Sequence, residues 1–259
     1  MYKGTHDGDI DEIKFVVEFN SNKSRFQKYL NLFSQYQNVW MVRVTSKQLS
    51  KLSNKKVFTR SDTYLASFKE DISYLLDKYD YYISEDILME NNIQYNKISN
   101  SGVSVKMTSS KKFQILKTGP NSFNGLFGSY ELGAGASLYC QRENELPKNL
   151  QLITGWNTTV NQMTNYFQQY TKGDTNFYLN KEICANIKNY SNKEIEHMIH
   201  TSSDLQKKIF NGIGLYEEPY TALFFYHGLE IHKLTTIPFC VTTGSGRSKG
   251  EYTIVLKPI

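Results

Sequence analysis

The chain has 259 residues, a hydrophobic content of 39% and a formal net charge of +5, from 30 Lys and Arg against 25 Asp and Glu. This length is enough for one large domain or two small ones with a buried core. The sequence has no apolar run near the ~20 residues that a membrane span needs, so we expect no membrane partner. The mildly basic charge permits a polyanionic partner but does not require one.

Short features of the sequence bear on cellular location and on the cysteines. The N-terminal sequence MYKGTHDGDIDEI lacks the apolar segment of a secretory signal, so we expect a cytoplasmic protein. Cys140, Cys184 and Cys240 are odd in number and far apart, which fits neither a disulfide framework nor a four-thiolate zinc site. We interpret them as packing residues in a reducing compartment.

The first hundred residues predict alternating helices and strands. Helical spacing of Ile10, Ile13 and Val17 predicts a helix over 7–20, with Asp9 as its N-cap and Glu12 three residues later in a capping position. Strands are expected over 38–45 and 61–68, and a helix over 69–80. Residues 91–102 are rich in Asn and Ser and are expected to form a loop.

The stretch GVSVKM, residues 102–107, alternates apolar and polar side chains. It predicts a strand with Ser104 and Lys106 on one face and Val103, Val105 and Met107 on the other. After a turn at TSS, the sequence KKFQILK (111–117) predicts a second short strand.

The rest of the chain predicts helices followed by strands. Residues 124–140 carry four glycines but neither a G-x-x-x-x-G-K-[ST] nor a G-x-G-x-x-G motif. Residues 142–211 are expected to be helical. The tail is expected to form strands over 220–234 and 237–259, and within the second range two strands are joined by a turn of Gly, Ser and Arg. We therefore expect one α/β domain over 1–259 with a mixed central sheet flanked by helices. Its catalytic core would span about 1–140, and a helical and C-terminal β-hairpin part about 141–259.

Asp62 and the Ser104-x-Lys106 pattern suggest a chemistry. Phosphodiester hydrolysis uses divalent cations held by acidic oxygens, a polarised water and a cation near the scissile phosphate. An Asp at the start of one strand and a Lys on the neighbouring strand, two residues after a polar or acidic residue, supply such groups.

This arrangement resembles the PD-(D/E)XK nuclease superfamily and, within it, type II restriction endonucleases. The resemblance is carried by Arg60-Ser61-Asp62, Val105-Lys106 and Ser109-Ser110-Lys111-Lys112. It implies a restriction-endonuclease-like fold, Mg²⁺ as cofactor and double-stranded DNA as substrate. It also implies Asp62 as metal ligand, the carbonyl of Val105 as a second ligand, Lys106 beside the attacking water, and Glu12 as an acid from the first helix.

The sequence departs from this superfamily pattern at two points. Ser104 stands where many members have Glu, which leaves the second acid open among Glu12, Glu18, Asp86 and Glu131. The gap from Asp62 to Lys106 is longer than usual, as if 68–100 were an insertion, and Asp86 is therefore the rival of Asp62. We prefer Asp62 because it lies in a strand-like context. Capping alone would also account for Glu12.

The C-terminal sequence VTTGSGRSKGEYTIVLK resembles the terminal hairpins of such enzymes. Arg pairs both acceptors of guanine in the major groove, so Arg247 is the expected base contact. Ser248 and Lys249 are expected at phosphates. Lys111, Lys112 and Gln114 are further candidate DNA contacts, although plain solvation explains the lysines equally well.

Restriction implies a cognate DNA methyltransferase as functional partner, with the endonuclease a monomer or homodimer. Two alternatives remain open: a non-catalytic nucleic-acid-binding protein, and a repair nuclease of the same fold. His197 and His200, three residues apart on an expected helix, lack the Cys or carboxylate that would complete a zinc site. His227 and His232 suit a sheet location.

Overall fold

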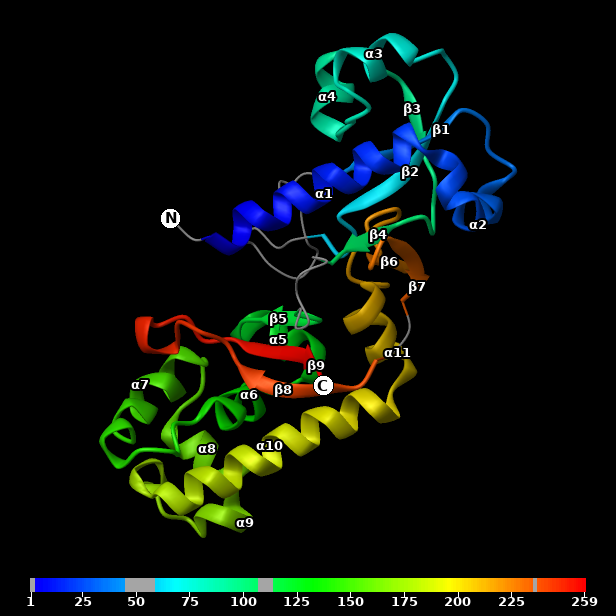
Figure 1. Ribbon diagram of the computed structural model, residues 1–259. Helices are drawn as coiled ribbons and strands as arrows, with labels where there is room; N and C mark the ends of the chain where they lie inside the picture. Colours follow the sequence, from blue (N-terminus) through cyan, green and yellow to red (C-terminus); the bar gives the residue numbers. More distant parts are fainter. Residues whose placement is uncertain (1–2, 45–58, 107–113, 235–236) are drawn as a thin grey trace. The chain divides into compact units, whose positions relative to one another are not determined.

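The computed structural model describes residues 3–44, 59–106, 114–234 and 237–259, and the side chains of the first segment from Asp9 onward. The chain forms two compact units, each built from two separate segments. Unit 1 comprises Met1–Phe113 and Phe210–Thr236, and unit 2 comprises Gln114–Ile209 and Ile237–Ile259. Figure 1 shows the elements of each unit along the chain. The expectation of a single domain over 1–259 stays a prediction.

Unit 1 is built on a mixed sheet of order β1-β2-β4-β6-β7, with β3 also paired to β2. β2 runs antiparallel to β1, β3 and β4, whereas β4 and β6 are parallel and β6 and β7 are antiparallel. The strands are β1 (Val39–Arg43), β2 (Thr63–Phe68), β3 (Tyr95–Lys97), β4 (Val103–Val105), β6 (Phe224–His227) and β7 (Glu230–Lys233). β4 and β6 are neighbours in the sheet although unit 2 accounts for most of the sequence between them.

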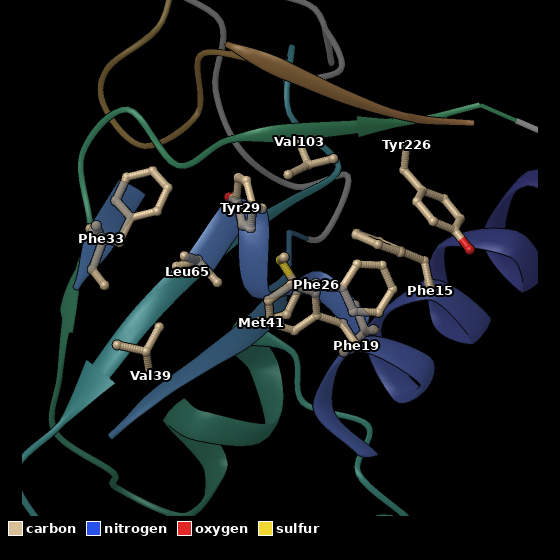
Figure 2. Close-up of a cluster of buried hydrophobic side chains, with 12 residues drawn as sticks. Phe15, Phe19, Phe26, Tyr29, Phe33, Val39, Met41, Leu65, Val103 and Tyr226 are labelled. Atoms are coloured by element: carbon tan, nitrogen blue, oxygen red, sulfur yellow. The ribbon is translucent and has the colours of Figure 1, made fainter. Parts of the chain in front are cut away.

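Aromatic side chains cover one face of this sheet. They come from α1 (Lys3–Ser21), the 3-10 helix η1 (Lys23–Phe26), α2 (Gln27–Leu30) and η2 (Asn31–Phe33), and pack on Val39, Met41, Leu65 and Val103. Figure 2 shows Phe15 and Phe19 of α1 directed at this face, with Tyr226 of β6 beside Phe15. The Phe15 and Tyr226 rings stack with centroids 4.1 Å apart. Burial of these rings fixes α1 against the sheet.

The other face of the sheet packs on α3 (Ser73–Lys78) and α4 (Glu85–Glu90). Val42, Tyr64, Ala66 and Phe68 point to this side, opposite to Met41 and Leu65. Because side chains alternate along a strand and both faces are covered, β1 and β2 contain nearly continuous buried runs. Helices thus flank the central sheet on both faces, and the expected broad class, mixed α/β, is confirmed.

Unit 2 combines helices with a small antiparallel sheet of order β5-β9-β8. β8 (Phe239–Thr243) and β9 (Ile254–Pro258) form the expected C-terminal hairpin, and β5 (Leu116–Thr118) pairs with β9. The turn between β8 and β9 contains the 3-10 helix η6 (Arg247–Lys249), with Gly246 and Gly250 at positive φ on either side.

Four helices of unit 2 begin at a polar side-chain cap. Asn180 caps the longest helix in this unit, and Thr159 and Gln162 form a capping box at the start of α8. The α-helices are α5 (Pro120–Phe127), α6 (Tyr130–Ser137), α7 (Lys148–Gly155), α8 (Val160–Tyr166), α9 (Gln168–Thr171), α10 (Lys181–Thr201) and α11 (Ser203–Gln206). Two short 3-10 helices are η3 (Glu143–Glu145) and η4 (Phe177–Leu179). The π-helical turn η5 (Lys207–Asn211) contains the point in the sequence where unit 2 ends and unit 1 resumes. The expected helical region over 142–211 is therefore confirmed.

Some local expectations were wrong. The first helix begins at Lys3 and not near Asp9, so Asp9 and Glu12 lie inside α1 and do not cap it. Residues 91–102 contain the short strand β3 in addition to loop. The expected strand over 111–117 falls partly outside the described residues, and its remainder contributes to β5. Within the described ranges, none of the helices has both the length and the apolar character needed to cross a membrane.

Candidate functional site

Asp62 lies directly before β2, where that strand meets β4. Thr63 pairs with Val103, and the backbone N–H of Asp62 donates to the carbonyl of Val103 at 2.9 Å. This register places the Asp62 side chain beside the next two residues of β4. Its Oδ2 atom accepts hydrogen bonds from the Ser104 hydroxyl at 3.1 Å and from the Val105 N–H at 2.7 Å.

The carbonyl of Val105 faces the same side of β4 as Asp62. Lys106 donates its backbone N–H to Tyr226 of β6 at 2.9 Å, and the N–H of Val105 is directed at Asp62. Backbone groups of successive residues alternate between the two neighbours of a strand, and the N–H and C=O of one residue point the same way. The Val105 carbonyl is therefore directed away from β6, toward the side where Asp62 lies.

The ammonium group of Lys106 interacts with the charges of both predicted acids, Asp62 and Glu12. Burial lowers the pKa of Lys106, the carboxylates of Asp62 and Glu12 oppose this effect, and Arg60 adds to it. Val103 is buried in the aromatic core, Ser104 alternates with it along β4, and Lys106 directly follows this strand. The placement of Lys106 on the face opposite to Val103 stays a prediction, and Met107 lies outside the described residues.

Asp62 is a half-buried carboxyl group, and its surroundings shift its pKa in both directions. Burial raises its pKa, whereas Lys106, the Val105 N–H, the Ser104 hydroxyl and Arg60 lower it. Arg60 is half-buried and donates from Nε to the carbonyl of Phe210 at 2.9 Å, and desolvation lowers its pKa to about 10. Two cations therefore stabilise the charged form of Asp62.

Glu12 is the acid of α1 that comes close to Asp62. Burial and the charge of Asp62 raise the pKa of Glu12 to about 7, and Arg43 of β1 opposes the shift. Nε and Nη2 of Arg43 contact the same oxygen of Glu12, Oε2, at 2.8 and 2.7 Å, and Nη2 also contacts Asp9 at 2.7 Å. Oε1 of Glu12 and Oδ1 of Asp62 have no hydrogen-bond partner within the described part of the chain. The interpretation of Glu12 as a helix cap is wrong because Glu12 lies inside α1, where it pairs with Arg43.

The other candidate acids have different surroundings. Glu18 pairs with Arg25 and accepts from the Tyr226 hydroxyl at 2.9 Å. Asp86 lies in the first turn of α4, and among the described residues neither a hydrogen bond nor an ion pair joins it to Ser104 or Lys106. Glu131 belongs to unit 2, where it accepts from Thr158. Glu12 is the candidate acid on whose pKa the charge of Asp62 acts.

The donor set fits a hard divalent cation. The charge of Asp62 raises the pKa of Glu12, and each carboxylate keeps one oxygen without a partner within the described ranges. Carboxylate and carbonyl oxygens are the ligands that Mg²⁺ prefers, and it usually keeps several waters. Asp62, Glu12 and the Val105 carbonyl match this preference. In the described segments, no group of three or more His, Cys, Asp or Glu side chains that could hold a metal ion is found.

The predicted DNA contacts of the C-terminal turn lie in unit 2. Arg247 is directed inward: its Nη1 donates to the carbonyls of Ser137 and Leu138, and its guanidinium lies over the ring of Tyr139. Ser248, Lys249 and Gln114 are exposed. Lys111 and Lys112 lie outside the described residues. Base reading by Arg247 stays a prediction, and the fold occupies part of its hydrogen-bonding capacity.

The histidines have structural neighbours. His200 of α10 stacks on Phe239 with ring centroids 5.2 Å apart, and His197 is exposed. His227 and His232 lie on the β6–β7 hairpin, as expected.

Sequence reasoning missed Arg43. The sequence could have indicated it, because Arg43 stands within the apolar strand sequence VWMVRVT. A cation removed from water in such a strand needs an acidic partner from another element.

Comparisons of this chain with protein-family models, with curated proteins and with solved structures find no match. We therefore base the function on the geometry around Asp62.

Proposed function

We propose that the protein is a Mg²⁺-dependent endonuclease that hydrolyses phosphodiester bonds of double-stranded DNA at specific sequences, a type II restriction enzyme of the PD-(D/E)XK superfamily. The observation that carries the proposal is the meeting of Asp62, Lys106 and Glu12 where β2, β4 and α1 come together. The mixed sheet flanked by helices is compatible with a restriction-endonuclease-like fold.

Each residue of the site has a role in this chemistry. Asp62 and Glu12 would hold Mg²⁺ with the Val105 carbonyl. A bound Mg²⁺ lowers the pKa of a coordinated water and offsets charge that develops on the phosphate. Lys106 would hold the attacking water and stabilise the charge that develops in the transition state. Burial lowers its pKa, and the charges of Asp62 and Glu12 oppose this shift.

Ser104 would act through Asp62. It occupies the position of the Glu in E-x-K, and its hydroxyl donates to Oδ2 of Asp62 at 3.1 Å. Together with the Val105 N–H, this bond directs Oδ1 away from β4 and fixes the orientation of the carboxylate. The acid absent at position 104 is supplied in this proposal by Glu12, which Arg43 positions.

Lys106→Ala tests the proposal. We expect the purified variant to lose at least ~100-fold of its cleavage rate on unmethylated duplex DNA with Mg²⁺, since a charge-stabilising group at the reacting phosphate contributes on that scale. DNA binding in Ca²⁺ should remain within a few-fold of the wild type.

Lys69→Ala is the matched control, because Lys69 is an exposed lysine of the same unit. It should cleave like the wild type. A wild-type protein that binds DNA but never nicks it with Mg²⁺, Mn²⁺ or any other divalent metal would contradict the proposal and favour a non-catalytic binding protein. Cleavage that follows damage or DNA structure, without a fixed sequence, would favour a repair nuclease.

This function also implies partners. A sequence-specific nuclease requires a cognate methyltransferase that protects host DNA in the cytoplasm. We expect the enzyme to act as a monomer or a homodimer.

A further inference from the structure

Unit 2 contains a shallow pocket at the start of its C-terminal turn. Four parts of the chain line the pocket: the residues that follow α6, the helix α7, the 3-10 helix η6 and the residues that precede β9. It is lined by Tyr139, Lys148, Gln151, Arg247, Ser248 and Tyr252. Lys148 and Arg247 bring two cations to this lining, which contains no acidic side chain.

The Arg247 guanidinium is held in a fixed orientation at the edge of this pocket. It lies 3.6 Å from the centroid of the Tyr139 ring, and Nη1 donates to the carbonyls of Ser137 and Leu138. These carbonyls belong to the C-terminal end of α6, which carries a partial negative charge and favours a cation. In the part of the chain that is described, the N–H groups on Nε and Nη2 have no partner. The guanidinium is therefore oriented in advance of any ligand.

A second half-buried cation contacts one of these carbonyls. Lys188 of α10 donates to the carbonyl of Leu138 at 3.1 Å, and Arg247 approaches this oxygen at 3.3 Å. Burial and the charge of Arg247 lower the pKa of Lys188 to about 8, and the opposing influence comes from the thiol of Cys140 and not from a carboxylate. The positive charges of Lys188 and Arg247 therefore meet at one oxygen and repel each other, and a bound anion would lower this repulsion.

Further donors on the pocket lining have unused capacity. Within the described residues, the Ser248 hydroxyl and the Gln151 side-chain amide have no hydrogen-bond partner, and both residues are exposed. Lys148 is 3.9 Å from Glu145, a long and exposed ion pair that contributes little.

Gly155 leaves room for the aromatic wall of the pocket. A Cβ at this position would come within 1.9 Å of the Tyr252 ring, so the ring can lie against α7 only where a glycine stands.

We propose that this pocket binds a phosphate group, with Arg247, Lys148, Ser248 and Gln151 as its donors. Planar arginine forks and lysine ammonium groups are the usual partners of phosphate oxygens. The phosphate belongs either to a nucleic-acid backbone or to a small phosphorylated molecule. The proposal does not require the endonuclease activity, and it assigns Arg247 to phosphate and not to a base.

Lys148→Gln tests the proposal with inorganic phosphate as the probe. We expect saturable phosphate binding to the wild-type chain in isothermal titration calorimetry, with shifts of the Gln151 side-chain amide in NMR spectra. Lys148→Gln should weaken the binding about fivefold, since an exposed charge contact is worth up to about 1 kcal/mol. Lys193→Gln is the matched control, because Lys193 is an exposed lysine of α10 in the same unit, and its affinity should equal that of the wild type.

Arg247→Lys keeps the positive charge but loses the planar fork, and it should also weaken phosphate binding while unit 2 stays folded by circular dichroism. Absence of saturable phosphate binding to the folded wild-type protein would overturn the proposal. So would equal weakening by Lys148→Gln and Lys193→Gln.

A second experiment, with duplex DNA, distinguishes the two possible sources of the phosphate. Binding of a duplex oligonucleotide is measured against salt concentration without Mg²⁺, so that a failure of cleavage does not affect the result. If the site holds a backbone phosphate, Lys148→Gln lowers the salt slope by about 1 relative to Lys193→Gln. An unchanged slope together with retained phosphate binding supports the same site as one for a small phosphorylated molecule.

Discussion

At the scale of single residues, the site combines two carboxyl groups that are difficult to ionise together. Burial and the nearby Asp62 raise the pKa of Glu12 to about 7. Burial also raises the pKa of Asp62, and Lys106 and Arg60 oppose that shift only in part. A divalent cation would neutralise both acids, which links metal binding, pH and stability.

The pH dependence of stability follows from the raised pKa of Glu12. A carboxyl group with a higher pKa in the folded than in the unfolded protein binds protons more tightly when folded. The free energy of unfolding therefore falls as pH rises from about 4.5 to about 7, by at most ~1.4 kcal/mol for each pH unit. We predict this fall in urea denaturation with EDTA, and we predict that Glu12→Gln flattens most of it. An equally steep fall in Glu12→Gln would contradict the assignment.

Mg²⁺ should reverse this trend because it binds the ionised carboxylates. We predict that millimolar Mg²⁺ raises the melting temperature more at pH 8 than at pH 6, measured by differential scanning calorimetry. Glu12→Gln and Asp62→Asn should each abolish most of the increase, since a ligand stabilises only the state that binds it. Glu70→Gln, which changes an exposed acid of the same unit, should leave the increase intact. Equal stabilisation of all variants would indicate that Mg²⁺ binds elsewhere.

The sequence predicted the members of this site better than their partners. Asp62, Ser104 and Lys106 follow from strand alternation and from the spacing of one motif, and the structure brings them together. The contact of Glu12 with Arg43 depends on how α1 lies across the end of β1, which periodicity does not reveal. The capping interpretation was wrong for the same reason, since a D-x-x-E pattern inside a helix looks like one at its start.

At the scale of elements, the strand β4 is fixed by the loop that precedes β6. A Cβ at Gly102 would come within 1.7 Å of the Thr221 carbonyl oxygen and 2.7 Å of the Pro219 carbonyl oxygen. Backbone atoms cannot yield as a flexible side chain does, so this approach requires glycine. Ser61 donates to the same loop at Pro219, which connects the start of β2 to it as well.

Gly102→Ala should therefore displace β4 from the loop and from Asp62. We predict a loss of about 1–3 kcal/mol in the free energy of unfolding, the usual cost of overpacking, together with a reduced cleavage rate. Gly119→Ala is the control, because its Cβ would meet the nearest backbone atom at an ordinary 3.7 Å. A Gly102→Ala protein as stable and active as Gly119→Ala would show that β4 is not held in this way.

Elements with clear periodicity were predicted well, and elements that depend on tertiary packing were not. The strands β1, β2 and β4 and the long helix α10 match their expected positions. The glycine-rich region contains α6, in which Gly133 and Gly135 lie against Trp156 and Phe167. Glycine disfavours helix, so local propensity pointed away from α6, and the close approach of neighbouring rings explains the glycines.

At the scale of the whole molecule, the chain passes between its two units more than once. Residues 114–209 interrupt unit 1, and residues 210–236 return to it before the C-terminal hairpin joins unit 2. These crossings have no Pro- or Gly-rich linker, so composition gave no sign of them. The parallel pairing of β4 with β6 is the physical link that reunites the two segments of unit 1.

The proposed function requires this molecule to cut duplex DNA at a fixed sequence with Mg²⁺. The most direct test is to digest unmethylated phage DNA with the purified protein and Mg²⁺, and to map the fragment ends by sequencing. We predict discrete fragments whose ends share one short sequence, with none in EDTA or with Lys106→Ala. Intact DNA, or a smear with ends at unrelated sequences, would show that the protein is not such an enzyme.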